Sequence, residues 1–111
     1  MIGFRFARLA RDDVSDLLAY SRRRFGSQAA DAYESLLIRA FATIRAYPSA
    51  RSVKPMTGRS GVFRFHLRSV SQAKPRAVSR PRHVVIFTFD EVGVTVVRVL
   101  HEKMEIERHL P

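Results

Sequence analysis

The chain has 111 residues, of which 46% are hydrophobic and none is cysteine, and its formal net charge at pH 7 is +10. This length predicts one domain over residues 1–111, and the apolar content excludes global disorder. The absence of cysteine excludes disulfides, a thiol nucleophile and thiolate-bound metals. No stretch is typical of an export signal or a membrane span, so we expect a cytoplasmic protein without a membrane partner.

The positive charge is concentrated in the middle of the chain. Residues 35–89 contain eleven Arg or Lys residues and no Asp or Glu, whereas the segments on either side are close to neutral. Seventeen of the 20 basic residues are arginine, whose planar guanidinium binds carboxylates and phosphates through two parallel hydrogen bonds. This distribution indicates either an ordinary solvated basic face or a surface for an acidic partner, protein or nucleic acid.

The first half of the chain predicts a strand and two helices. Alternating apolar and polar residues near the N-terminus predict a short strand. Asp12 and Asp13 favour a helix N-terminus, since the helix dipole stabilises carboxylates there, and Gly26 favours the end of that helix. Ser27 would cap a second helix that ends before Pro48. Because so few residues separate the two helices, we expect them to form a hairpin.

The second half of the chain has the periodicity of strands. Residues 48–60 and 69–82 are rich in Pro, Gly and polar residues, which indicates two loops. A tight turn is expected at Gly93, because glycine adopts positive φ without strain. Residues 103–110 have apolar side chains at helical spacing, which predicts a short C-terminal helix. The predicted strands are 63–68, 83–89 and 94–101.

This order predicts an α+β fold of the type β-α-α-β-β-β(-α), with the helical hairpin on one face of a small antiparallel sheet. The last two strands are apolar on both faces, so one face would carry an exposed apolar patch for a partner or for self-association. With a basic rim, the patch would suit an acidic amphipathic helix. We expect the helices to cover Val85, Phe87, Phe89, Val97 and Val99, or the exchanged set. The expected patch and rim are Arg59, Arg64, His66, Arg68, Arg82, Val84, Ile86, Val94, Val96 and Leu100.

The sequence offers little for catalysis or metal binding. The four histidines lack metal-ligand spacing and clustered carboxylates, so no metal or other cofactor is expected. There is no nucleophile elbow and no Gly-rich phosphate loop. Arg64, His66, Arg68 and His83 would suit a phosphate, but residues 35–89 supply no carboxylate base. All three tyrosines lie in the helical hairpin. We therefore predict a binding face without catalytic residues.

Two groups of residues resemble ParE toxins, which belong to the RelE/ParE superfamily. The first group, in the helical hairpin, consists of Asp16-Leu-Leu-Ala-Tyr20, Phe25-Gly26, Ala32-Tyr33, Leu37, Ala40-Phe41, Ile44 and Pro48. The second consists of the stretch from Val97 to His101 with its Arg-Val-Leu-His block, then Met104-Glu105 and Arg108-His-Leu110. Together these residues span nearly the whole chain.

The resemblance implies the toxin of a type II toxin–antitoxin system that poisons DNA gyrase without catalytic side chains. It implies a complex with a ParD-type antitoxin, whose acidic C-terminal segment would bind the basic and apolar surface described above. No small-molecule substrate is implied. The resemblance links toxicity, and thus contact with gyrase, to the C-terminal residues Lys103, Met104, Glu105, Glu107, Arg108, His109 and Leu110.

Two alternatives remain open at this point. The first is a ribosome-dependent ribonuclease of the RelE kind, in which Arg64 and Arg82 would hold phosphate and His109 would donate the proton. The missing acidic residues and the positions of the tyrosines argue against it. The second alternative is a basic binding module without toxicity.

Overall fold

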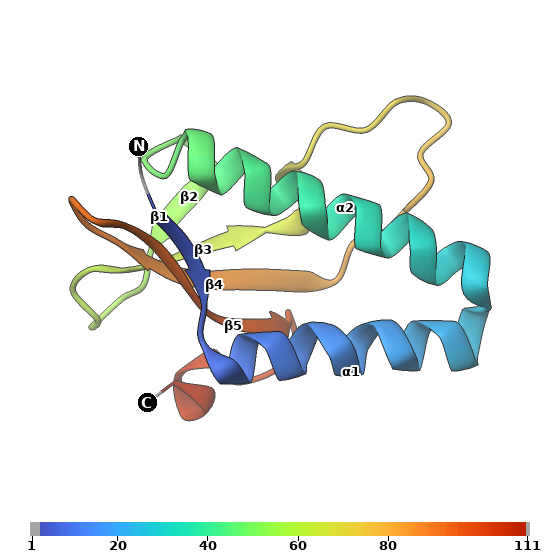
Figure 1. The fold of residues 1–111 in the computed structure, drawn as a ribbon, viewed down its shortest axis with the longest axis horizontal. Helices are drawn as coiled ribbons and strands as arrows, with labels where there is room; N and C mark the ends of the chain where they lie inside the picture. The colour runs from blue at the N-terminus through green and yellow to red at the C-terminus, as the bar shows by residue number, and fades with distance from the viewer. Residues whose placement is uncertain (1–2, 111) are drawn as a thin grey trace.

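Two helices lie side by side over one face of a five-stranded sheet in the computed structural model, which describes residues 3–110 (Figure 1). The elements are β1 (Gly3–Phe6), α1 (Arg8–Phe25), α2 (Ser27–Ala46), β2 (Val53–Pro55), β3 (Val62–His66), the 3₁₀ turn η1 (Leu67–Ser69), β4 (His83–Phe89), β5 (Gly93–His101) and the 3₁₀ turn η2 (Ile106–His109). The strand order is β1-β5-β4-β3-β2. No helix within the described residues is long and apolar enough to cross a membrane.

The predicted α+β class and helical hairpin are confirmed, but the sheet is mixed rather than antiparallel. β1 runs parallel to β5, with Phe4 opposite Val94. The other neighbouring strands are antiparallel. Parallel strands require a long connection, which the chain between β1 and β5 provides. The alternating residues of β1 indicate a strand but carry no information about its direction.

The loop predicted at 48–60 contains a short strand, so that prediction is wrong in part. β2 pairs with β3 and places Val53 opposite Phe65. β2 has three residues and ends in a proline, which an outer strand tolerates because one of its edges has no partner strand. The second predicted loop is confirmed, since residues 70–82 contain no helix or strand.

The helix boundaries differ from the prediction in three places. α1 begins at Arg8, so Asp12 and Asp13 lie beyond its first turn, which contains no acidic residue. α2 begins at Ser27 and its N-cap residue is Gly26, so Ser27 is the first helical residue rather than the cap. Residues 103–110 form the single 3₁₀ turn η2 in place of a helix. A segment this short gains too few backbone hydrogen bonds to form a stable α-helix.

The strand predicted at 63–68 ends at His66. Leu67 belongs to η1 and is fully buried. The turn at Gly93 is confirmed, with a φ of 153°. A Cβ atom there would lie 2.1 Å from the carbonyl oxygen of Gly3. Any side chain at Gly93 would therefore separate β1 from β5, so the close approach of these strands requires glycine.

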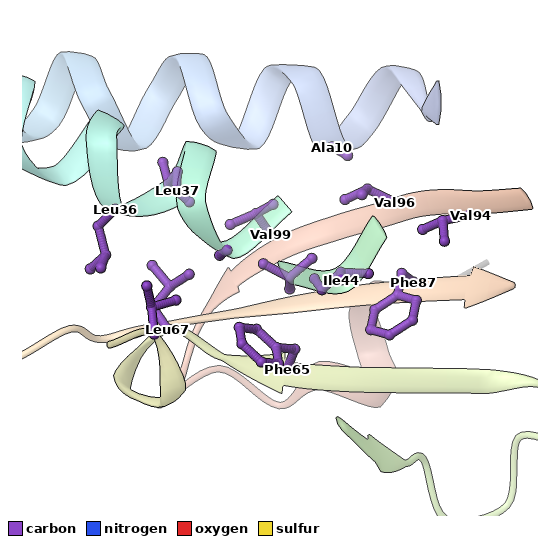
Figure 2. Packing of buried hydrophobic residues seen from close by; sticks show 13 residues of the cluster. Ala10, Leu36, Leu37, Ile44, Phe65, Leu67, Phe87, Val94, Val96 and Val99 are labelled. Atoms are coloured by element: carbon purple, nitrogen blue, oxygen red, sulfur yellow. The ribbon is translucent and has the colours of Figure 1, made fainter. Parts of the chain in front are cut away.

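The main core lies between the helical hairpin and the sheet (Figure 2). Leu37 and Ile44 of α2 are at most 1% exposed and pack against strand residues such as Phe65 and Phe87. The buried members of this core are Ala10, Leu36, Leu37, Ala40, Ile44, Phe65, Leu67, Val70, Val85, Phe87, Val94, Val96 and Val99. Burial of these side chains holds the helices on the sheet.

A β-bulge between β4 and β5 changes which side chains face the helices. Ile86 lies opposite Arg98, but the next residue, Phe87, lies opposite Val96, so β5 contains one extra residue. Beyond the extra residue, each side chain of β5 points to the face opposite to the one that simple alternation predicts. Val94 and Val96 therefore belong to the core under the helices. Our assignment of these two valines to the opposite face is therefore wrong.

The opposite face of the sheet, called here the second face, is covered rather than open. Val84 and Ile86 are 5% and 0% exposed and form a second cluster with Met56. Ile106 and Leu110 from the C-terminal segment pack against this cluster. The predicted exposed apolar patch is therefore wrong, because two apolar side chains of a short tail suffice to cover it. Leu100, which pairs with Val84, is also buried, at 2% exposure.

Candidate functional site

A groove of about 680 Å³ lies beside the hairpin, at the end of β5. The exposed apolar side chains that line it are Tyr20 and Phe25 of α1 and Met104, which follows β5. They are 56%, 67% and 37% exposed, and the two aromatic rings are in edge-to-face contact at 6.4 Å. Large apolar side chains that remain this exposed around one concave surface are typical of a partner-binding site. Arg80 and Arg82 line the same groove.

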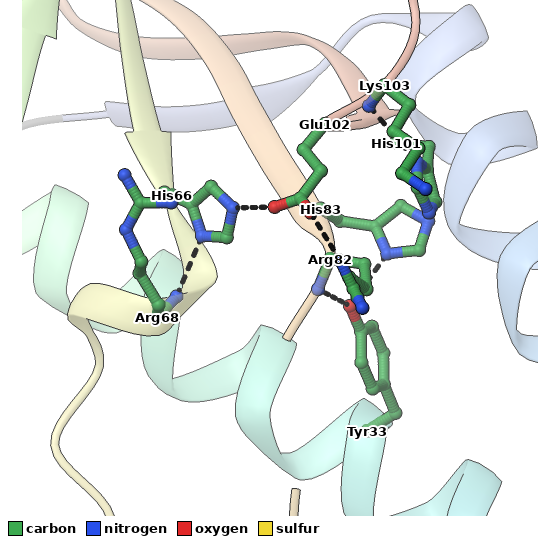
Figure 3. Close-up of polar contacts among 8 residues, drawn as sticks. All are labelled: Tyr33, His66, Arg68, Arg82, His83, His101, Glu102 and Lys103. Atoms are coloured by element: carbon green, nitrogen blue, oxygen red, sulfur yellow. Dashed lines mark hydrogen bonds and ion pairs between the residues drawn. The ribbon is translucent and has the colours of Figure 1, made fainter. Parts of the chain in front are cut away.

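A histidine cluster forms the polar wall of this groove and the adjacent end of the sheet (Figure 3). The cluster consists of Tyr33, His66, Arg82, His83, His101 and Glu102. In it, the Tyr33 hydroxyl lies 2.6 Å from Nδ1 of His83 and accepts the backbone N–H of Arg82 at 3.1 Å. Burial raises the pKa of Tyr33, so the hydroxyl keeps its proton at neutral pH and can donate a hydrogen bond to Nδ1 of His83.

The hydrogen bonds of the cluster fix the same tautomer in three imidazoles. Nδ1 of His66 accepts the backbone N–H of Arg68 at 3.0 Å, and Nδ1 of His101 accepts that of Lys103 at 3.1 Å. The Tyr33 hydroxyl already accepts the backbone N–H of Arg82, and its own proton has no other acceptor within residues 3–110, so it donates to Nδ1 of His83. An imidazole whose Nδ1 accepts a hydrogen bond carries its proton on Nε2. The three rings therefore present N–H donors, and no ring nitrogen is free to act as a base.

Glu102 is the acidic centre of the cluster. Its two oxygens accept from Nε2 of His66 at 2.7 Å and from Nη1 of Arg82 at 2.9 Å. The hydrogen bond from Arg82, followed by that from His66, lowers the pKa of Glu102 to about 2. A carboxylate so acidic and so fully engaged is a poor general base near pH 7. The arrangement favours binding of a partner over acid–base catalysis.

We predict that acid destabilises the protein through His83. Burial, with help from His101 and His66, lowers the pKa of His83 from 6.5 to about 4. Between these values the unfolded chain binds a proton that the folded chain excludes. The free energy of unfolding should therefore fall by about 3 kcal/mol from pH 6.5 to pH 4. Below pH 4.5 the paired carboxylate of Glu102 adds to the loss, since its depressed pKa stabilises the fold only while it is ionised.

Urea unfolding at several pH values measures this effect. The matched variant is His83→Gln, whose amide still accepts from Tyr33 but does not titrate. It should flatten the pH dependence between 6.5 and 4.5. An unchanged pH dependence in that variant would contradict the role of His83.

The C-terminal segment 103–110, called here the tail, is held by a partly buried ion pair that we call the Arg98 clamp. Nε and Nη2 of Arg98 donate to the carboxylate of Asp13 at 2.8 and 2.9 Å, and Nη1 donates to the carbonyl oxygen of His109 at 2.8 Å. Asp13 also accepts the backbone N–H of Val99 at 2.9 Å. Both side chains are 14% exposed. Arg98 thus joins α1, β5 and the tail at one point.

The predicted tail residues divide between exposed and docked positions. Lys103, Glu107 and Arg108 are exposed, and Arg108 forms an ion pair with Glu105 at 2.6 Å. Leu110 packs against the second face. The other two predicted tail residues are Met104, which lines the groove, and His109, whose carbonyl oxygen accepts a hydrogen bond from Arg98.

The predicted patch and rim are not a continuous surface. Arg64 and Arg68 are exposed, but Arg82 and His66 are engaged by Glu102. Arg59 lies in the turn between β2 and β3. Val84, Ile86, Val94, Val96 and Leu100 are all buried.

Sequence reasoning missed how distant residues complete the histidine cluster. The sequence offers no carboxylate within residues 35–89 and no tyrosine in the sheet or the tail, and both statements hold in the structure. The missing groups come from other segments instead. Glu102 reaches His66 from the end of β5, and Tyr33 reaches His83 from α2. The pairing of β4 with β5 places His83 opposite His101, which is the one signal that strand alignment could have supplied.

Two of the three residues considered for a ribonuclease site have other partners in the structure. Arg82 donates to Glu102, and the carbonyl oxygen of His109 accepts from Arg98. Within residues 3–110, no group of three or more histidine or acidic side chains is arranged to hold a metal ion.

Comparisons with known proteins agree with this fold. The family model described as "ParE toxin of type II toxin-antitoxin system, parDE" matches residues 4–106. A solved structure described as the chromosomal ParDE toxin–antitoxin system from P. aeruginosa superposes with a TM-score of 0.69 at 12% identity, covering 91% of this chain and 96% of that one. No curated protein sequence matches the chain significantly. Because the family model covers almost the entire chain, the protein belongs to the ParE toxin family of type II toxin–antitoxin systems.

Proposed function

We propose that this ParE toxin inhibits DNA gyrase by binding it, without catalysing a reaction of its own. Membership of the ParE family supports the toxin role. The observation that carries the mechanism is the Arg98 clamp, which docks the tail while Lys103, Glu107 and Arg108 stay exposed. A fixed backbone with exposed charges of both signs is suited to recognising another protein, because less conformational entropy is lost on binding.

We further propose that a ParD-type antitoxin neutralises the toxin by binding in the groove. The exposed Tyr20, Phe25 and Met104 supply apolar contacts, and Arg80 supplies positive charge for an acidic segment. The second face is a less suitable surface, since a partner reaches Ile86 only by displacing the tail. The exposed Arg64 and Arg68 remain proposed contacts for the charged part of the antitoxin, where they would mainly increase the association rate.

Expression of the chain alone, compared with coexpression of its antitoxin, tests the proposal. We expect growth arrest with DNA damage, and relief by the antitoxin. The purified chain should convert supercoiled plasmid to linear DNA when gyrase is present and the complex is denatured, because inhibited gyrase remains covalently bound to cut DNA. Cut mRNA with intact DNA would instead identify a ribonuclease. Neither effect, in a folded chain, would identify a non-toxic binding module.

A further inference from the structure

We propose that His83 and His101 form a carboxylate-binding subsite at the polar end of the groove, which recognises one Asp or Glu side chain of the partner segment. This inference rests on the proposed binding of an antitoxin in the groove and specifies the chemical group that is recognised there. Both histidines line the groove, and their rings are in edge-to-face contact at 5.3 Å (Figure 3).

The hydrogen bonds of the two rings leave a donor on each. Nδ1 of His83 is occupied by Tyr33 and Nδ1 of His101 by the backbone N–H of Lys103, so both rings carry hydrogen on Nε2. In residues 3–110 neither Nε2–H has an acceptor. The third histidine of the cluster, His66, differs because its Nε2–H is used by Glu102. Two adjacent unused donors are suited to the two oxygens of a carboxylate.

The charges around the groove favour an acidic peptide over a nucleic acid strand. Arg80 also lines the groove, and no carboxylate in the described part of the chain pairs with it. A single carboxylate at the two histidines would gain from this positive charge. Asp16 lines the groove as well, and Glu102 lies in the adjacent cluster. A run of phosphates would meet these acidic side chains, whereas one acidic residue at the polar end avoids most of that repulsion.

The rest of the groove fits the other side chains of such a segment. Tyr20, Phe25 and Met104 provide an apolar surface beside the histidines. An amphipathic helix with apolar residues on one face and an acidic residue near one end would fill both parts. Because its pKa is about 4, His83 is neutral at pH 7. Its contact with a carboxylate is therefore a hydrogen bond, whose strength depends on geometry.

Histidine-selective nitrogen NMR of the free protein tests the subsite directly. We expect Nε2–H tautomers for His66, His83 and His101. Acetate, added at constant ionic strength, should shift the rings of His83 and His101 in a saturable way and leave His109, which does not line the groove, unaffected. Inorganic phosphate is the second probe and should act more weakly. A response no larger than that of His109 would overturn the subsite, and a stronger response to phosphate would overturn the carboxylate assignment.

Two variants of His101 test the same subsite in the complex. His101→Leu removes the donor and should weaken binding of the cognate antitoxin at least 10-fold, whereas His101→Gln keeps an N–H donor and should stay within about 3-fold. Melting temperatures of both variants report whether the fold is intact. Equal affinity for the Leu variant and the unmodified chain would overturn the inference. If the antitoxin does not bind the unmodified chain, the result contradicts the proposed function and not the subsite. The acetate titration is then the test of the subsite.

Discussion

Replacing Arg98 with alanine is expected to destabilise the protein by about 2–3 kcal/mol and to release the tail. Removal of Arg98 leaves the carboxylate of Asp13, which is 14% exposed, without its charge partner and without two of its hydrogen-bond donors. The change also removes the hydrogen bond that holds the carbonyl oxygen of His109. Without it, the apolar contacts of Ile106 and Leu110 remain to keep the tail on the second face. Denaturant unfolding measures the change in stability.

The milder change Arg98→Lys separates the release of the tail from unfolding. A lysine keeps one positive charge for Asp13 but lacks the second and third arms of the guanidinium. We expect a folded protein that still binds antitoxin, because Tyr20 and Phe25 of the groove lie outside the tail, and that forms fewer cleavage complexes with gyrase. Because the chain has no cysteine, a spin label at Glu107→Cys reports the mobility of the tail specifically. The same label at Glu91→Cys, in the β4–β5 turn, is the control.

Full toxicity of the Arg98→Lys variant, together with a mobile label at position 107, would show that the docked position of the tail does not matter. A rigid label in the Arg98→Ala variant would show that the apolar contacts hold the tail without the clamp. Either result contradicts the role assigned to Arg98.

Replacing Phe25 with glutamate is expected to weaken antitoxin binding about 30-fold or more. Phe25 is the most exposed aromatic side chain of the groove, at 67%, so its removal costs the free toxin little stability. Exposed aromatic side chains that become buried at an interface often supply a large part of the binding energy. The added carboxylate also repels an acidic partner. Isothermal titration calorimetry measures the affinity, and melting temperature should change by only a few degrees.

The matched control is Ile38→Glu. Ile38 lies on α2 with 61% exposure and does not line the groove, so it tests the effect of a new charge on an exposed apolar position elsewhere. We expect near-normal affinity for this variant. Equal losses at both positions would indicate a general charge effect, and unchanged affinity for Phe25→Glu would place the antitoxin outside the groove.

The sequence determined the local elements of this protein. Helical spacing of apolar residues predicts both helices, and the glycines at 26 and 93 mark the breaks where positive φ is needed. Alternation and β-branched residues predict β3, β4 and β5. These signals act between residues close in the chain, which is why periodicity is enough to find them. The family resemblance could be recognised for a related reason, since it depends on residue order and spacing along the chain.

Only the tertiary structure decided which faces and partners these elements use. The extra residue of β5 reverses the side-chain alternation, so Val96 faces the helices, and no property of the valines themselves indicates this. Asp13 lies beyond the first turn of α1 and pairs with Arg98, which is 85 residues away in the chain. Tyr33 meets His83 across 50 residues in the same way. Such contacts depend on strand order and on how the helices pack on the sheet, and these are set by the burial of the whole core rather than by any local pattern.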